Sequence, residues 1–73
     1  MSVNQIHRRL LGEAVRVKRK KIGFTQEKLA EKSNLSTVFI SRIERGIESP
    51  SVDNLVKIAK ALGLRVRDLV NEF

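Results

Sequence analysis

The chain has 73 residues, of which 15 are Lys or Arg and 8 are Asp or Glu, so its formal net charge is +7. This length allows one small domain, residues 1–73, with a compact core. The absence of cysteine excludes disulfides and thiolate metal sites and fits a reducing cytoplasm. No apolar run approaches membrane-spanning length, and no signal-peptide core follows the N-terminus.

The basic excess is concentrated at the start of the chain. Residues 1–24 hold seven basic residues and one acidic residue, residues 25–50 hold four of each, and residues 51–73 hold four basic and three acidic. This excess predicts a polyanionic partner, such as DNA, RNA or an anionic membrane, although a solvated basic face would also explain it. Three phenylalanines without Trp or Tyr offer no stacking platform of the single-strand or RNA type.

An apolar pattern of helical period begins within this basic segment. We expect residues 1–5 to lack regular structure and a helix to span residues 5–21, with Gly23 as its capping glycine. One stripe of this helix should be buried, and a second apolar strip lies on a neighbouring face. The stripe contains Leu11, Val15 and Ile22, and the second strip contains Ile6, Leu10, Ala14 and Val17.

Residues 25–46, TQEKLAEKSNLSTVFISRIERG, predict two short helices joined by a tight turn. Thr25 and Ser36 are the expected N-caps, because a hydroxyl can accept a hydrogen bond from the first-turn N–H groups. Asn34 suits the turn because asparagine tolerates the left-handed conformation. The buried stripe of the second of these helices should contain Ile40, Ile43 and Ile47.

Two charged residues interrupt these apolar stripes. Arg19 stands between Val15 and Ile22, and Glu44 stands on the stripe of the later helix. A charge on an inward face is costly unless it is paired, so we expect an Arg19–Glu44 ion pair that joins the two helices. Two separate side chains that extend to solvent are the alternative.

The remaining residues predict two more helices, so the chain should form a five-helix, all-α domain. Ser51 is the expected N-cap of the fourth helix, which closes at Gly63. The last helix is amphipathic, and its apolar residues either close the core or form a two-fold dimer interface. We expect the dimer, through an element at residues 62–73 that presents Leu64, Val66, Val70 and Phe73.

Helix, tight turn and helix is the helix-turn-helix arrangement, whose second helix enters the DNA major groove. The patterns Q-x-x-L-A at residues 26–30 and I-S-R-I-E-R-G at residues 40–46 resemble the Cro/repressor-type (Xre-like) family of DNA-binding domains. The resemblance covers residues 11–69 and implies a lambda-repressor-like fold, with the motif at the second and third helices. It also implies the Arg19–Glu44 pair. Asn34 departs from the family pattern, since many relatives have glycine there.

The outward side of the third helix supplies the expected base readers. Val38 suits a thymine methyl group, and Arg42 has the fork that reads guanine O6 and N7, although it could bind phosphate instead. The resemblance implies base contacts by Thr37, Val38, Ser41 and Arg42. It implies phosphate contacts by Gln26 and Arg45, and further phosphate contacts are expected from Ser36, Arg16 and either Lys20 or Lys21.

Two acidic residues lie one turn apart on the outer face of the first motif helix. Glu27 and Glu31 match the positions at which some repressors of this family contact RNA polymerase as activators. Ordinary surface charge that balances Lys28 and Lys32 is the alternative. The resemblance therefore adds RNA polymerase as an expected partner, and leaves activation or repression open.

The sequence gives catalysis little basis, because His7 is the single histidine and no metal-spaced cluster or phosphate-cradling loop is present. We expect no enzyme, cofactor, metal, membrane or small-molecule ligand. The expected function is a cytoplasmic regulator of bacterial or phage origin that binds double-stranded DNA as a homodimer on a near-palindromic operator. Chains of this size resemble autoregulated restriction–modification controller proteins, and next small phage repressors. An antitoxin and a protein-interaction adaptor stay open as alternatives.

Overall fold

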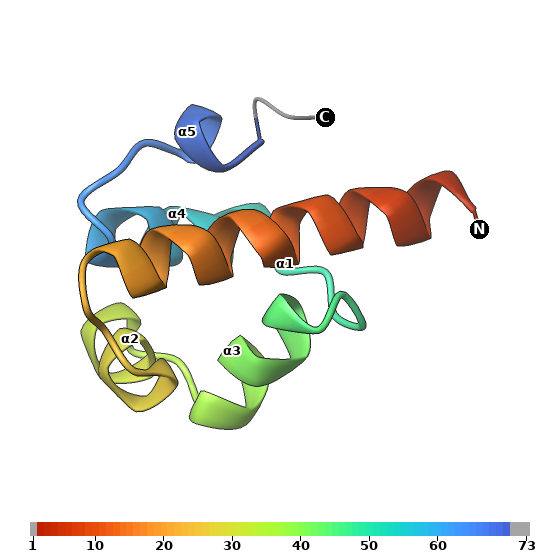
Figure 1. Ribbon diagram of the computed structural model, residues 1–73. Coiled ribbons are helices and arrows are strands. Elements are labelled where there is room, and N and C mark those ends of the chain that lie inside the picture. The colour runs from red at the N-terminus through yellow and green to blue at the C-terminus, as the bar shows by residue number, and fades with distance from the viewer. Residues whose placement is uncertain (1, 71–73) are drawn as a thin grey trace.

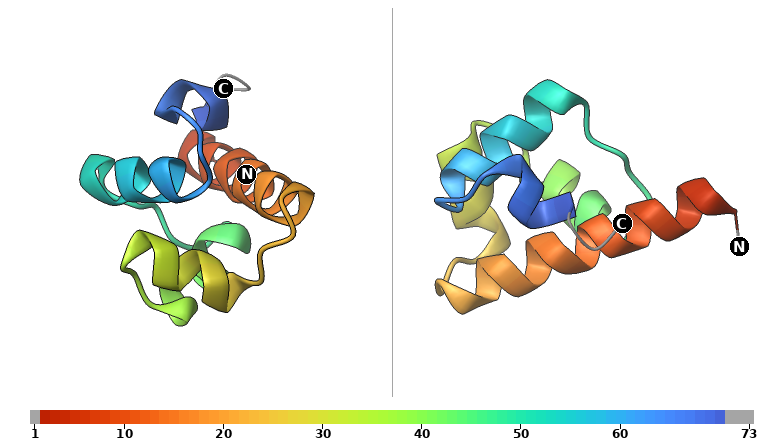
Figure 2. Two further views of the ribbon diagram at one scale, coloured as in Figure 1. Left: turned by 90° about the vertical axis from the view of Figure 1, so that its left-hand side faces the viewer. Right: turned by 90° about the horizontal axis from the view of Figure 1, so that it is seen from above.

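The computed structural model describes residues 2–70, which form five helices (Figure 1). The helices are α1 (Val3–Lys21), α2 (Gln26–Ser33), α3 (Thr37–Glu44), α4 (Val52–Ala61) and α5 (Val66–Val70). The long α1 packs against α3 and α5, which lie on different sides of it, while α2 packs against α3 and α4 (Figure 2). The expected five-helix, all-α architecture is confirmed.

Serine or threonine caps the amino end of each of the four longer helices. The hydroxyls of Thr25, Ser36 and Ser51 each accept a hydrogen bond from the backbone N–H three residues further on, at 3.0–3.1 Å. The expectation that residues 1–5 lack regular structure is wrong, because α1 begins at residue 3. Ser2 and Gln5 form a capping box, in which the Ser2 N–H donates to Gln5 Oε1 at 2.8 Å.

The turn between α2 and α3 depends on Asn34. Its backbone has φ 58° and ψ 41°, the left-handed conformation that the sequence predicts. The next N–H, of Leu35, donates to the Ala30 carbonyl at 2.9 Å and satisfies an orphan carbonyl of α2. Only Leu35 and Ser36 separate Asn34 from the first residue of α3, which sets the two motif helices in a fixed relation.

The core draws on all five helices. Its fully buried side chains are Val15, Leu29, Ile40, Ile43, Ile58 and Leu69. Two residues expected in it are not buried, because Ile22 is 45% exposed and Ile47 is 54% exposed. Ile22 directly follows the last residue of α1 and Ile47 lies three residues beyond the last residue of α3, so the helical spacing that predicts burial no longer applies there.

The first helix comes very close to the carboxyl end of α3. A Cβ atom on Gly12 would lie 2.2 Å from the carbonyl oxygen of Ile43 and 2.9 Å from that of Glu44. No side chain fits at such distances, so glycine is required where the two main chains meet. This contact is absent from the expectations drawn from sequence.

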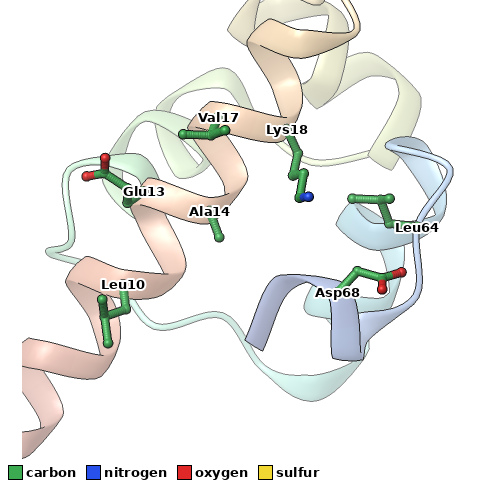
Figure 3. A pocket seen from close by; sticks show the side chains of 7 residues that line it. All are labelled: Leu10, Glu13, Ala14, Val17, Lys18, Leu64 and Asp68. Atoms are coloured by element: carbon green, nitrogen blue, oxygen red, sulfur yellow. The ribbon is translucent and has the colours of Figure 1, made fainter. Parts of the chain in front are cut away.

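The second apolar strip of α1 is only partly covered. Leu10 is 36% exposed and Val17 is 51% exposed, while Ala14 is half-buried. Between this strip and the segment around α5 lies a groove of about 490 Å³ (Figure 3). It is lined by Leu10, Glu13, Ala14, Val17, Lys18, Leu64 and Asp68.

Candidate nucleic-acid interface

The third helix has one buried face and one open face. Ile40 and Ile43 are fully buried, whereas Val38 is 67% exposed. Residues three and four positions apart along a helix share a side, so the expected base readers lie together on the open face. Of these four, Val38 and Arg42 are exposed, and Thr37 and Ser41 are half-buried.

The carboxyl end of α3 is held by a buried ion pair. Arg19 Nε donates to Oε2 of Glu44 at 2.6 Å and Nη2 donates to Oε1 at 2.9 Å, so the pair is bidentate. The two side chains are only 9% and 3% exposed. The structural ion pair expected from the two interrupted stripes is therefore present.

Two further hydrogen bonds complete this cluster. Gln26, the first residue of α2, donates from Nε2 to Glu44 Oε1 at 3.1 Å, and Arg19 Nη1 donates to the carbonyl of Phe24 at 2.8 Å. The hydrogen bond to Glu44 raises the pKa of Arg19, burial opposes this, and the negative charge of Glu44 adds to the rise. The cluster links α1, α2 and α3 at one point.

The expected phosphate contacts lie on three segments. Ser36 and Arg45 are exposed at the two ends of α3, and Gln26 is half-buried at the start of α2. Arg16 and Lys20 are exposed one turn apart on α1, and Arg16 Nη2 lies 3.4 Å from Glu13 Oε2. The structure thus joins Gln26 to the carboxyl end of α3 through its hydrogen bond to Glu44. Arg16 and Lys20 take no part in this contact.

The two acidic residues of α2 are exposed. Lys28 Nζ lies 3.3 Å from Glu31 Oε1, on the same helix, so part of this charge is balanced locally. The buried side of α2 consists of Leu29, Ala30 and Ser33. Glu27 and Glu31 therefore present carboxylates to solvent from the first motif helix, a position from which a second protein could be contacted.

The expected dimerisation element is attached to the core. Leu69 is fully buried, while Leu64, Val66 and Val70 are half-buried and pack against the core. Phe73, the fourth expected interface residue, lies outside the described residues. Each of the three described side chains therefore retains some apolar surface that is open to solvent.

A contact that the sequence analysis did not identify joins α3 to the loop after it. Arg42 Nε donates to Oε1 of Glu48 at 3.2 Å. The six-residue separation exceeds one helical turn, so no helix-period rule indicates it. The only local signal is Gly46, whose positive φ of 77° turns the chain back after α3.

Residues 2–70 contain no group of three or more His, Cys, Asp or Glu side chains that could hold a metal ion. Within the same range, none of the helices has the length and apolar character needed to cross a membrane.

Comparison with known proteins identifies the family. A family model described as helix-turn-helix matches residues 15–69. Control protein C.BamHI of Bacillus amyloliquefaciens is 45% identical over 65 residues, which cover 88% of this chain and 80% of that protein.

Two solved structures share the fold. The restriction-modification controller protein C.AhdI from Aeromonas hydrophila superposes with a TM-score of 0.83 at 34% identity, covering 85% of this chain and 94% of that one. The P22 c2 repressor protein, in complex with a synthetic operator, superposes with a TM-score of 0.79 at 33% identity, covering 86% and 96%. This chain therefore belongs to the helix-turn-helix family of DNA-binding transcriptional regulators.

Proposed function

We propose that this protein is a restriction–modification controller that binds a near-palindromic operator as a homodimer and regulates its own synthesis. The proposal is supported by its similarity to C.BamHI and C.AhdI, a control protein and a controller protein by name. Such a protein acts in the bacterial cytoplasm, where its DNA target lies, and needs no catalytic group, cofactor or small-molecule ligand.

The observation that carries the proposal is the solvent-exposed face of α3, a helix whose carboxyl end is held by the Arg19–Glu44 pair. Val38 is 67% exposed and adds nothing to the core of the domain. In the major groove its apolar side chain meets a thymine methyl group. Arg42 reads guanine, while Thr37 and Ser41 donate to neighbouring base edges. Rigid support matters because base discrimination depends on hydrogen-bond geometry.

Phosphate contacts set the register of this helix on the duplex. Gln26 and Ser36 lie at the amino ends of α2 and α3, where backbone N–H groups also attract anions. Arg45, Arg16 and Lys20 add cations around them. The overall charge of +7 favours such an arrangement.

The dimer forms through residues 62–73. Leu64 lines the groove beside α1, Val66 and Val70 are half-buried on α5, and pairing of two copies covers the apolar surface that these three side chains keep. A two-fold pair presents two copies of α3 to half-sites about one helical turn apart on DNA. The rate of synthesis of the protein would then depend on the concentration of its own dimer.

Glu27 and Glu31 contact RNA polymerase when the bound dimer activates transcription. Both carboxylates are exposed on α2 and belong to the motif that is closest to the DNA. Glu27→Lys together with Glu31→Lys is expected to abolish activation in a reporter assay while operator binding persists. Loss of both properties together would contradict the polymerase contact.

The test of the main proposal is selection of random duplex DNA on the purified protein. The enriched sequences should share a two-fold symmetric consensus, and sedimentation should show two protein chains on each duplex. An affinity that falls steeply with salt and shows no consensus would mean that DNA is bound only as a polyanion. The regulator would then have to act through another partner.

The partly exposed strip of α1 favours one second candidate, an antitoxin. Ile6 of this strip is 42% exposed, Val3 before it is 65% exposed, and neither residue lines the groove beside the expected dimer element. An antitoxin needs a surface that binds a toxin in addition to DNA. Thiol labelling of an Ile6→Cys variant in the DNA-bound dimer tests this, because the chain has no other cysteine and protection of that position would leave no such site open.

A further inference from the structure

Arg42 is held by a carboxylate that lies outside its own helix. Its Nε donates to Oε1 of Glu48 at 3.2 Å, and the two side chains are 47% and 35% exposed. Both groups therefore remain accessible to a duplex on the open face of α3. This ion pair therefore includes the side chain that is expected to contact a base.

The backbone after α3 explains why Glu48 faces Arg42. The N–H of Gly46 donates to the Ile43 carbonyl at 3.0 Å, and the N–H of Ile47 donates to the Arg42 carbonyl at 3.1 Å. With Gly46 at φ 77°, these two bonds form a Schellman motif, which reverses the chain at the helix end. The reversal brings the next residue, Glu48, alongside the last turn of α3.

The contact engages one edge of the guanidinium. Nε binds Glu48, and among residues 2–70 the two terminal nitrogens of Arg42 have no hydrogen-bond acceptor. Those two nitrogens form the fork that matches guanine O6 and N7. Glu48 thus binds Nε, which takes no part in reading guanine with the two terminal nitrogens. The same hydrogen bond restricts rotation of the guanidinium group that carries those nitrogens.

We propose that Glu48 is a positioning residue that determines specificity by orienting Arg42 for guanine. This inference rests on the proposed function. A carboxylate near DNA also repels phosphate, so Glu48 lowers affinity for every duplex while it raises preference for the correct one. The informative quantity is therefore the ratio of affinities between two duplexes and not either affinity alone.

The test compares binding of wild type, Glu48→Ala, Glu48→Gln and Arg42→Ala to the selected operator and to duplexes changed at one base pair. Fluorescence anisotropy gives each affinity. In Glu48→Ala, discrimination should fall about two- to fivefold at the base pair that Arg42→Ala identifies, as expected for an exposed ion pair. Discrimination at other base pairs should stay unchanged, and affinity for all duplexes should rise.

Three comparisons make the result specific. Glu48→Gln keeps an oxygen acceptor for Nε and should retain the discrimination. In the Arg42→Ala background, Glu48→Ala should no longer change any ratio. Asp53→Ala removes an exposed carboxylate from α4 and serves as the matched control, which should leave every ratio unchanged.

Three outcomes overturn the inference while the proposed function stands. An unchanged ratio in Glu48→Ala means that the pair does not act on readout, and a raised ratio means that Glu48 masks Arg42 from DNA. If Arg42→Ala alters no base preference, Arg42 reads no base and the inference also falls. A wild-type protein without any consensus instead refutes the proposed function, and the inference with it.

Discussion

The two ends of α3 are held in opposite ways. The amino end carries Val38, 67% exposed, and its fixed points are the Ser36 cap and the backbone of the turn. The carboxyl end carries Glu44, buried in hydrogen bonds from α1 and α2. A helix of eight residues is too short to be stable by itself, so its direction comes from the held end. The exposed residues at the amino end are not constrained by the core, so their side chains can suit the DNA target.

The largest expected effect breaks the held end. Arg19→Met leaves the Glu44 carboxylate buried without its cation, which should cost about 3–5 kcal/mol of unfolding free energy. That loss is a large share of the about 5–15 kcal/mol typical of a domain, so the variant should unfold at a much lower urea concentration than the parent. Urea denaturation followed by circular dichroism measures it.

The control for this variant removes both charges. Arg19→Met combined with Glu44→Leu should recover most of the lost stability, because no unpaired charge then remains in the interior. A double variant no more stable than Arg19→Met would show that the cluster acts through packing instead.

A second effect tests the backbone contact beside that cluster. Gly12→Ala introduces a Cβ 2.2 Å from the Ile43 carbonyl oxygen and should destabilise the domain by about 1–3 kcal/mol. Glu13→Ala, at the exposed neighbouring position, should stay within about 0.5 kcal/mol of the parent. A Gly12→Ala protein as stable as the parent would mean that α1 can move away from α3.

The open face of α3, which includes Arg42, should respond in the reverse manner. Arg42→Ala is expected to lose about 1–3 kcal/mol of discrimination at one base pair and to leave thermal unfolding unchanged. Arg67→Ala, an exposed cation on α5, is the matched control for the loss of one positive charge. Equal weakening on every duplex by both variants would assign Arg42 to phosphate.

The smallest effect separates capping from DNA contact. Ser36→Ala and Ser51→Ala each remove a hydroxyl that accepts an N-cap hydrogen bond, so each should cost about 1 kcal/mol of stability. Only Ser36 stands at the amino end of α3, so only its variant should also weaken binding of the folded protein to the operator. Equal affinities for the two variants would remove Ser36 from the phosphate contacts.

Local rules predicted most of the fold. Hydroxyl caps, the left-handed Asn34 and the buried isoleucines of α3 follow from side-chain chemistry and helical period alone. The Arg19–Glu44 pair was also predictable, because a charge within an apolar stripe needs a partner. These signals are all present in short stretches of sequence.

The two wrong burial predictions and the two contacts that were not predicted depend on features beyond these local rules. Ile22 and Ile47 lie where a helix has just ended, and the apolar period alone does not show that end. The close approach at Gly12 and the contact between Arg42 and Glu48 depend on where distant main chains and a loop travel in space. An isolated glycine inside a helical pattern indicates a close approach without naming its partner.

The contact at Gly12 has a consequence for how the protein can change over time. At Gly12, α1 meets the main chain of α3, and their side-chain contact uses the buried Glu44, so the angle between the two helices does not depend on which residues α3 presents outward. Substitutions at positions 37, 38, 41 and 42 are then free of any requirement to preserve that angle. We expect families of such domains to diverge in the operators they recognise while the framework that carries the recognition surface is inherited intact.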